Sequence, residues 1–430
     1  MRTSTILNSY GFNTPTKITY VPKNDNSEQA FFPTESIVVR ELRELSTSLF
    51  LVDQYHPNTN QLEFETSNKE LWIDILPKFE AIYEFLTSNP INIAVVQKSK
   101  ESKVKYQTTF KEPNLRLGNS SICSFSGGAD STAGIVELLK NEPNPVMHHC
   151  LTGNRVYGRV KKLHSETTLS NSHLFLTDAR QFHKIGYSDL RNFVFLIDTF
   201  IVAHALGINH MVYPENGPLI LNPRMSNFKD PTKNSHPFLI CTLETIFKNL
   251  TEGSFSINCI FKDKTKCEVM APLLKDNLID MTNSCFIIQG QRGMCGNCFA
   301  CFVRRFSLLA FKYYEPCIYQ SDPFLASCRL ETTHETIKDL HDSILFLFNI
   351  ITGREEIGSS MIDIPNGFFQ NPTKLFENFA AEMFIGFKNY FEMNKEAQLS
   401  ALARFTKSLL EKINQSLLSS REEDLARLLC

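Results

Sequence analysis

The sequence predicts an α/β protein with a doubly wound parallel sheet as its core, an N-terminal α/β extension and a C-terminal helical extension. Three observations lead to this prediction. Short apolar runs alternate with helical stretches between about residues 118 and 325, as in folds whose helices cover both faces of a parallel sheet. One of these runs leads through a glycine loop directly into a helix. In the last segment, apolar residues recur at spacings of three and four, which is typical of one helix face.

Length and composition set the limits of the prediction. At 430 residues the chain is longer than one hydrophobic core usually serves, so we expect three zones, at residues 1–115, 118–325 and 330–430. Hydrophobic residues at 42% and charged residues at 21% are typical of a soluble globular protein. The formal net charge of -2 gives no general reason to expect nucleic acid as a partner.

The sequence also contains neither of the usual membrane signals. The first residues are not followed by the apolar segment of a secretory signal, and no run of about 18 apolar residues occurs. We therefore expect a cytoplasmic protein without a membrane partner. In a reducing cytoplasm, a cysteine cluster is more typical of a metal or catalytic site than of disulfide bonds.

The two outer zones carry no catalytic motif. In the first, apolar runs at 37–39, 48–52 and 91–96 predict strands, residues 71–85 predict an amphipathic helix, and the lysine-rich segment 98–106 predicts an exposed strand or hairpin. We expect this zone to pack on the core. In the last zone we expect a helix face that either packs on the core or docks a partner. Its residues are Leu399, Leu402, Phe405, Leu409, Ile413 and Leu417.

A strand, a loop and a helix are predicted in succession between residues 121 and 140. The apolar run 121–125 predicts a buried parallel strand, and residues 132–140 have helical character. The loop glycines let backbone N–H groups approach a phosphate, the helix N-terminus favours an anion, and the serine hydroxyls add donors. The carboxylate of Asp130 would repel phosphate, so we expect it to help hold Mg²⁺. The loop consists of Ser126, Gly127, Gly128, Ala129, Asp130 and Ser131, with Thr132 following.

The loop resembles the Ser-Gly-Gly-x-Asp-Ser fingerprint of the PP-loop ATP pyrophosphatases, which have a HUP-like core. It lacks the Gly-Lys-Ser/Thr ending of a Walker loop. The resemblance implies that ATP is cleaved between its α- and β-phosphates, with formation of a substrate adenylate. Asp130 and Ser131 are then expected to take part in catalysis. The alternative is a glycine turn capped by aspartate and serine.

Four cysteines predict a metal site. Cys285, Cys295, Cys298 and Cys301 follow the spacing C-x9-C-x2-C-x2-C, in which the last three converge and the first can complete a tetrahedron. Four thiolates without an open position are typical of structural Zn²⁺. Iron–sulfur ligation and unrelated buried cysteines are the alternatives. The remaining cysteines show no such spacing and are expected to be small buried hydrophobic residues.

The loop and the cysteines together are similar to the 7-cyano-7-deazaguanine synthase (QueC) family. That family carries zinc on four cysteines so spaced, with an arginine shortly afterwards, which Arg304 matches. Stretches 189–195, 214–217 and 265–269 also resemble family segments, so the resemblance covers about residues 118–310. The chain departs from the family's Tyr-Gly-Gln-x-His stretch. It offers only residues 156–159 and His164 there, and substrate contacts in this region stay open.

The resemblance implies roles for further residues. Lys266 would neutralise phosphate oxygens, the alternative being a surface salt bridge. Arg191 and Asn192 would recognise the nucleotide or the deazapurine, the alternative being a helix cap and a structural ion pair. Glu215 and Asn216 would bind the guanine-like edge of the substrate. His236 would contact the substrate from a loop, the alternative being a structural histidine.

The implied activity is that of an AMP- or ADP-forming ligase or synthase that makes a C–N bond. ATP would adenylate the carboxylate of 7-carboxy-7-deazaguanine, and an amine would then attack. Extra length at both ends is similar to enlarged QueC-like proteins of the CBASS and Qat anti-phage systems, in which the resemblance implies that a partner protein supplies the amine. We expect this protein-conjugating version. The alternatives are a nitrile synthase that uses ammonia in queuosine-type biosynthesis, a tRNA-sulfurating PP-loop enzyme, and a nucleotide-binding scaffold without activity.

Overall fold

The computed structural model describes residues 1–12, 17–21, 29–31, 37–98, 117–185, 190–221, 223, 225, 233–285, 294–315, 319–325, 334–357, 364–394 and 400–429. The chain divides into two units, each of which combines several segments. The first unit consists of Met1–Ser126, Gly134–Tyr213 and Thr232–Asn258. The second unit consists of Gly127–Ala133, Pro214–Pro231 and Cys259–Cys430.

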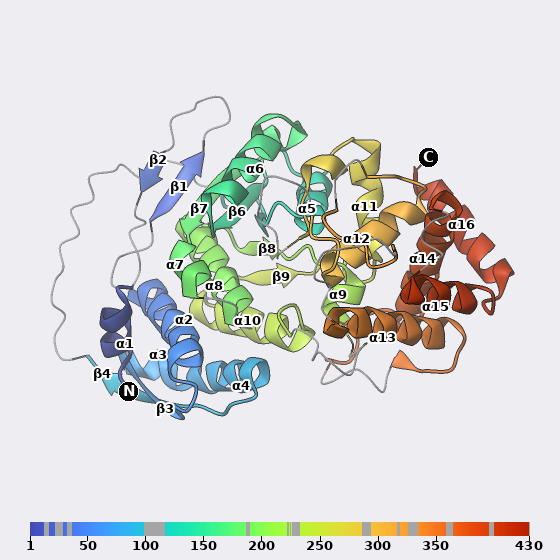
Figure 1. Ribbon diagram of the computed structural model, residues 1–430. Coiled ribbons are helices and arrows are strands. Elements are labelled where there is room, and N and C mark those ends of the chain that lie inside the picture. Colours follow the sequence, from blue (N-terminus) through green and yellow to red (C-terminus); the bar gives the residue numbers. More distant parts are fainter. Residues whose placement is uncertain are drawn as a thin grey trace. The chain divides into compact units, whose positions relative to one another are not determined.

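A mostly parallel sheet lies at the centre of the first unit (Figure 1). Its described strands follow the order β2-β1-β7-β6-β5-β8-β9, and all neighbours from β7 to β9 pair in parallel. The pairs β1–β2 and β1–β7 are antiparallel. The strands are β1 (Ile18–Val21), β2 (Gln29–Phe31), β5 (Ile122–Ser124), β6 (Val146–Leu151), β7 (His173–Asp178), β8 (His210–Val212) and β9 (Ser256–Asn258). The predicted α/β class with a parallel central sheet is therefore confirmed.

The register of β5 shows why this strand lies at the middle of the sheet. Ile122 faces Val146 of β6 and Met211 of β8, and all three side chains are fully buried. Such continuous burial is typical of parallel strands covered on both faces. The chain order runs outward from β5 through β6 to β7, then resumes on the other side with β8 and β9. In open parallel sheets, ligands usually bind beyond the carboxyl ends of the strands at such a reversal.

Helices of the first unit cover this sheet. Helix α8 packs on β5, β6 and β8, and α2 packs on α8. A separate pair of parallel strands, β3 (Gln61–Thr66) and β4 (Asn92–Gln97), belongs to the same unit. The helices are α1 (Thr3–Tyr10), α2 (Ile37–Tyr55), α3 (Lys69–Ile73), α4 (Leu76–Thr87), α6 (Asn154–Ser165), α7 (Arg180–Ile185), α8 (Leu190–Ala205) and α10 (Pro237–Leu250), with a 3-10 turn η1 (Thr168–Asn171).

The N-terminal zone corrects two predictions. The runs at 37–39 and 48–52 are not strands, because both belong to helix α2. Val39, Leu42 and Leu49 are buried at helical spacing, so packing against α8 overrides the strand preference of these apolar, partly β-branched runs. The strand predicted at 91–96 is confirmed as β4, and the helix predicted at 71–85 is present as α3 and α4. Residues 99–106 of the predicted hairpin lie outside the described residues.

The buried carboxylate of Glu41 links α2 to β3 and α3. Glu41 is fully buried, and its Oε2 accepts hydrogen bonds from Thr66 Oγ1 and Trp72 Nε1, both at 2.8 Å. Its Oε1 accepts a hydrogen bond from the backbone N–H of Ser67 at 2.6 Å. One side chain therefore satisfies three donors.

We predict that Glu41→Ala destabilises the protein by about 3 kcal/mol, because buried donors are left without an acceptor. Trp72 is the single tryptophan of the chain, so urea unfolding followed by its fluorescence measures this change directly. The control is Glu84→Ala on α4, whose side chain is exposed and whose loss should change stability by less than about 0.5 kcal/mol. Equal stability of the two variants would contradict the prediction.

The second unit is built mainly from helices, as predicted for residues 330–430. Helix α14 lies at its centre and packs on α9, α11, α12, α13, α15 and α16. The helices are α9 (Gly217–Leu221), α11 (Lys266–Lys275), α12 (Phe299–Ala310), α13 (His334–Ile351), α14 (Pro372–Met393), α15 (Ala401–Leu410) and α16 (Gln415–Leu429), with a 3-10 turn η2 (Ile279–Met281). Helix α5 (Ala129–Leu139) begins in the second unit and ends in the first.

The apolar face predicted from residue 399 to residue 417 is interrupted. Helix α15 ends at Leu410 and α16 begins at Gln415, so the six residues do not share one helix. Leu402, Leu409 and Ile413 are buried, whereas Leu417 is 41% exposed. After the break, Leu418 takes the buried position instead. Leu399 lies outside the described residues, and none of the described helices is long and apolar enough to cross a membrane.

Candidate functional site

The predicted order of strand, loop and helix is present around residues 122–139. Strand β5 ends at Ser124, and α5 begins at Ala129. Gly127 has a φ of 76°, in the left-handed region that other residues rarely adopt, so the sharp turn into the helix requires glycine. The Oγ of Ser131 and the Oγ1 of Thr132 donate to Gly128 O at 3.1 and 2.8 Å. These hydroxyls therefore also hold the first turn of the helix.

Four side chains of the second unit meet beside this first turn. Lys266 Nζ donates to Asp130 Oδ2. Asn216 Nδ2 donates to Asp130 Oδ1 at 3.1 Å and to Glu215 Oε1 at 3.3 Å. Lys266 is only 3% exposed, so its pair with Asp130 is not the surface salt bridge considered as the alternative. The structure thus brings together Asp130, Glu215, Asn216 and Lys266 from three separate parts of the sequence.

Two carboxyl groups of this cluster, those of Asp130 and Glu215, lie near the single ammonium group of Lys266. The pKa of Glu215 is raised to about 8, chiefly by burial and also by the negative charge of Asp130, while the positive charge of Lys266 opposes the rise. The raised pKa favours the neutral form of Glu215 near pH 7, so the negative charge of Asp130 faces the ammonium group of Lys266. Carboxylate oxygens are the ligands that Mg²⁺ prefers, and a bound cation would favour the ionised form of Glu215.

Helix caps position two of these residues. Asn216 is fully buried, and its Oδ1 accepts a hydrogen bond from Leu219 N at the start of α9. Lys266 is the first residue of α11, whose N-cap Thr265 forms a capping box with Glu268. The side-chain amide of Asn216 is thus used within the chain, where it holds the carboxylates of Asp130 and Glu215.

The remaining predicted substrate contacts lie in the first unit. Arg191 and Asn192 are on the first turn of α8, and Asn192 Nδ2 donates to Tyr213 Oη at 3.1 Å and to Asn234 O. His236 is the N-cap of α10, and its Nδ1 accepts from Phe238 N at 3.1 Å. The structure therefore brings Asn192 to the segment just before His236. The cluster around Asp130 belongs to the second unit.

The region in which the chain departs from the QueC pattern is helix α6. His164 is 2% exposed, and its Nε2 donates to Ser172 O at 3.1 Å. This contact ties the end of α6 to the start of β7. His164 thus has a structural contact that accounts for its burial.

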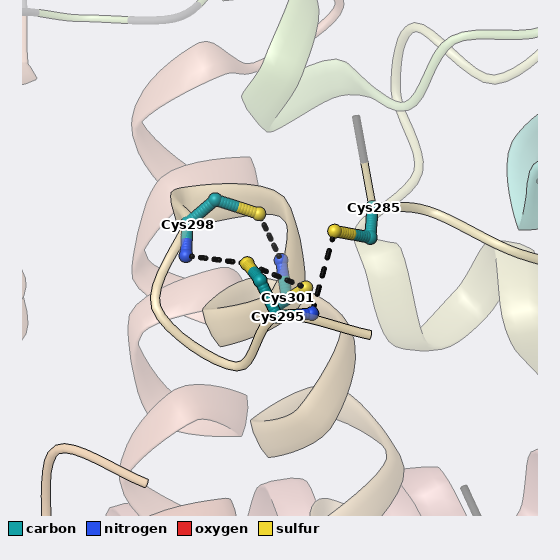
Figure 2. Close-up of side chains that lie close together, drawn as sticks. All are labelled: Cys285, Cys295, Cys298 and Cys301. Carbon is teal, nitrogen blue, oxygen red and sulfur yellow. Dashed lines mark hydrogen bonds between the residues drawn. The ribbon is translucent and has the colours of Figure 1, made fainter. Parts of the chain in front are cut away.

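The four predicted cysteines form a buried cluster, which Figure 2 shows. Their sulfur atoms all lie within 4.8 Å of one another, and Cys295 Sγ is 3.7 Å from Cys301 Sγ. Zn–S bonds of about 2.3 Å in a tetrahedron place two sulfurs about 3.8 Å apart. Backbone N–H groups of Cys298 and Cys301 donate to Cys295 Sγ and Cys298 Sγ at 3.3 and 3.4 Å. The residues therefore fit a metal ion such as Zn²⁺.

Local geometry explains how the segment 295–301, here called the knuckle, forms around its three cysteines. Cys298 is the N-cap of α12, so the positive end of that helix faces the thiolates. Gly296 has a φ of 82°, and a Cβ there would lie 1.9 Å from Ser321 O. Cys285 reaches the cluster from a separate segment, where its N–H donates to Asn283 Oδ1 at 2.8 Å. Only glycine fits at position 296, so the turn between Cys295 and Cys298 requires it.

Arg304 supports the segment that carries Cys285. The guanidinium is fully buried and donates to Thr282 Oγ1 at 2.7 Å and to Ile279 O at 2.8 Å. It also pairs with Glu315. Sequence reasoning matched Arg304 to the QueC pattern but did not find Glu315, because no motif or spacing marks this partner.

No protein-family model matches this chain, and no curated protein matches it.

Proposed function

We propose that this protein is an ATP pyrophosphatase of the PP-loop type with a QueC-like activity. In this proposal it adenylates the carboxylate of 7-carboxy-7-deazaguanine and joins the acyl group to an amine. The amine is proposed to belong to a partner protein, as in deazaguanine conjugation for anti-phage defence. The observation that carries the proposal is the convergence of Asp130, Glu215 and Lys266 at the start of the helix that follows the glycine loop.

The fold supports this proposal through the placement of the loop. The loop follows β5, the strand from which the sheet order runs outward in both directions, as in a doubly wound core. Helix α5 begins inside the loop, and the first N–H groups of a helix have no acceptor in the helix itself. Such groups favour a phosphate. Gly127 and Gly128 keep side chains away from this end of the helix.

The charged residues support the cleavage of ATP. In this proposal Asp130 and Glu215, which Asn216 holds, would bind Mg²⁺, and the ion would neutralise charge on the departing pyrophosphate. The ammonium of Lys266 lies at the same carboxylate and would contact phosphate oxygens. Asn216 keeps the two carboxylates in place from a fully buried position.

The proposed reaction proceeds in two bond exchanges. A carboxylate oxygen of the substrate attacks the α-phosphorus, and the bond to the β-phosphate oxygen breaks with release of pyrophosphate. The amine nitrogen then attacks the acyl carbon, loses a proton, and AMP leaves. Adenylation is needed because a free carboxylate is a poor electrophile. The four cysteines take no part in these steps, since a closed set of four thiolates holds a structural ion.

The source of the acceptor amine is tested by supplying ammonia and candidate partner proteins separately. The purified protein is incubated with 7-carboxy-7-deazaguanine and Mg-ATP, with either ammonia or proteins encoded beside it as acceptor. Mass spectrometry then measures AMP, nitrile and the intact mass of each protein. We expect AMP and a protein mass increase in the partner arm. Efficient nitrile formation from ammonia without any partner would instead favour the stand-alone synthase.

A sulfur-transfer enzyme and an inactive scaffold would each give a different result. A tRNA-sulfurating enzyme with an iron–sulfur cluster would be coloured and contain iron, whereas the proposal expects a colourless protein with one Zn²⁺. A scaffold without activity would form no AMP with any candidate substrate. That last result would overturn the proposed function.

A further inference from the structure

The first turn of helix α11, which begins with Lys266, is held by two residues from far along the chain. Thr265 Oγ1 donates to Glu382 Oε1 of α14 at 2.8 Å. Arg421 of α16 donates through Nη2 to Glu268 Oε1 at 2.8 Å and through Nε to Glu382 Oε1 at 3.1 Å. Because Thr265 and Glu268 close the capping box of α11, α14 and α16 both hold the turn that presents Lys266.

This cluster is buried. Thr265 and Glu382 are fully buried, and the side chain of Arg421 is 11% exposed. Burial raises the pKa of Glu382 to about 7, and the positive charge of Arg421 opposes that rise. Buried ion pairs add little net stability, because desolvation offsets their attraction, but loss of one partner is costly. A group of this kind is suited to fixing one arrangement of the helices.

The backbone connects this buried cluster to the charged residues around Asp130. Lys266 directly follows Thr265, and its ammonium pairs with Asp130. Helix α9, which begins directly after Asn216, also packs on α14. Helices α9 and α11, which follow Asn216 and begin with Lys266, therefore both pack on the same C-terminal helix, α14.

We propose that Glu382 and Arg421 are positioning residues for Lys266, and that the C-terminal helices are part of the machinery that places this ammonium at the nucleotide. Neither residue touches the reacting atoms; both act through Thr265 and Glu268. The inference rests on the proposed function, because the placement of Lys266 affects a reaction only if Asp130 lies in a nucleotide site. The arrangement of the helices does not depend on that function.

Helix α16 supplies a matched control. Arg427 lies on the same helix, is 74% exposed, and pairs with Asp424 and Glu423 at 3.2 and 3.8 Å. Both of these partners are on α16 itself. Arg427→Ala therefore removes an arginine from α16 without removing a contact to α11.

The test measures how accessible Lys266 is in the full-length protein. Natural protein, Arg421→Ala and Arg427→Ala are treated with an amine-acetylating reagent, and mass spectrometry of peptides follows Lys266. Lys275 at the exposed end of α11 serves as an internal standard. We expect Lys266 to be acetylated about tenfold faster in Arg421→Ala only, because its turn opens more often. The kcat for AMP formation should fall about tenfold or more in the same variant.

A second variant keeps the test decisive if Arg421→Ala does not fold. Glu382→Gln retains an oxygen that accepts from Thr265 but loses the charge that holds Arg421, so the same changes should occur to a smaller extent. Slow acetylation of Lys266 in every folded variant would overturn the inference. Faster acetylation in the variants, in a protein that forms no AMP, would support the positioning role while overturning the proposed function.

Discussion

Asp130→Asn is expected to lower the rate of AMP formation about a thousandfold, because it removes the charge proposed to hold Mg²⁺. Asparagine keeps the shape of the side chain. The negative charge of Asp130 is one cause of the raised pKa of Glu215, so its removal favours an ionised Glu215 beside Lys266, and we expect the variant to stay folded. The measurement is the initial rate of AMP and pyrophosphate release at saturating Mg-ATP, with circular dichroism to check folding.

The matched control for this prediction is Glu137→Gln. Glu137 lies on the same helix, α5, and its carboxylate pairs with Lys140 Nζ at 2.7 Å on a solvent-accessible face. Removal of that charge should leave the rate within about twofold, because exposed ion pairs contribute little. If a folded Asp130→Asn forms AMP at a rate within tenfold of the natural protein, Asp130 does not hold the catalytic cation.

Cys301→Ser is expected to abolish stoichiometric Zn²⁺ binding and to destabilise the protein by about 5 kcal/mol. The Cys301 side chain is fully buried, and a serine hydroxyl cannot replace a thiolate ligand there. Elemental analysis of the purified protein measures the metal content, and thermal unfolding measures the loss of stability. A strong chelator should lower the stability of the natural protein but not that of the variant.

Cys241→Ser is the control for the metal prediction. Cys241 lies on α10, is partly exposed and is not part of the four-cysteine cluster. Its replacement should change neither the zinc content nor the response to a chelator. A Cys301→Ser protein that retains one equivalent of Zn²⁺ after dialysis against a chelator would show that the cluster is not the metal site.

The sequence predicted the elements whose signals are local. The strand at 122–124, the loop and α5 form one continuous segment, so hydrophobicity, glycine spacing and helix character could be observed together. The four cysteines were found for the same reason, since three of them share one knuckle. Helix α2 was mistaken for strands because short β-branched runs within it are ambiguous, and only its packing on α8 decides the outcome.

The charged site was only partly predictable. Resemblance singled out Glu215, Asn216 and Lys266, but it assigned Glu215 and Asn216 to the substrate. In the structure Asn216 is buried and donates to Asp130 and Glu215. That role follows from burial and from a neighbour 86 positions away, neither of which the local sequence reports.

The sequence by itself determined the chemistry available to this protein: a glycine loop with an aspartate at a helix start, and four cysteines at zinc-binding spacing. The tertiary structure alone decided which charges act together. Lys266 reaches Asp130 across 136 positions, and Arg421 reaches Glu268 across 153. Contacts over such separations arise from the packing of whole helices, which leaves no periodic pattern in the residues that meet. Lys266, the lysine proposed to act beside the glycine loop, therefore depends on the C-terminal helices α14 and α16 for its placement.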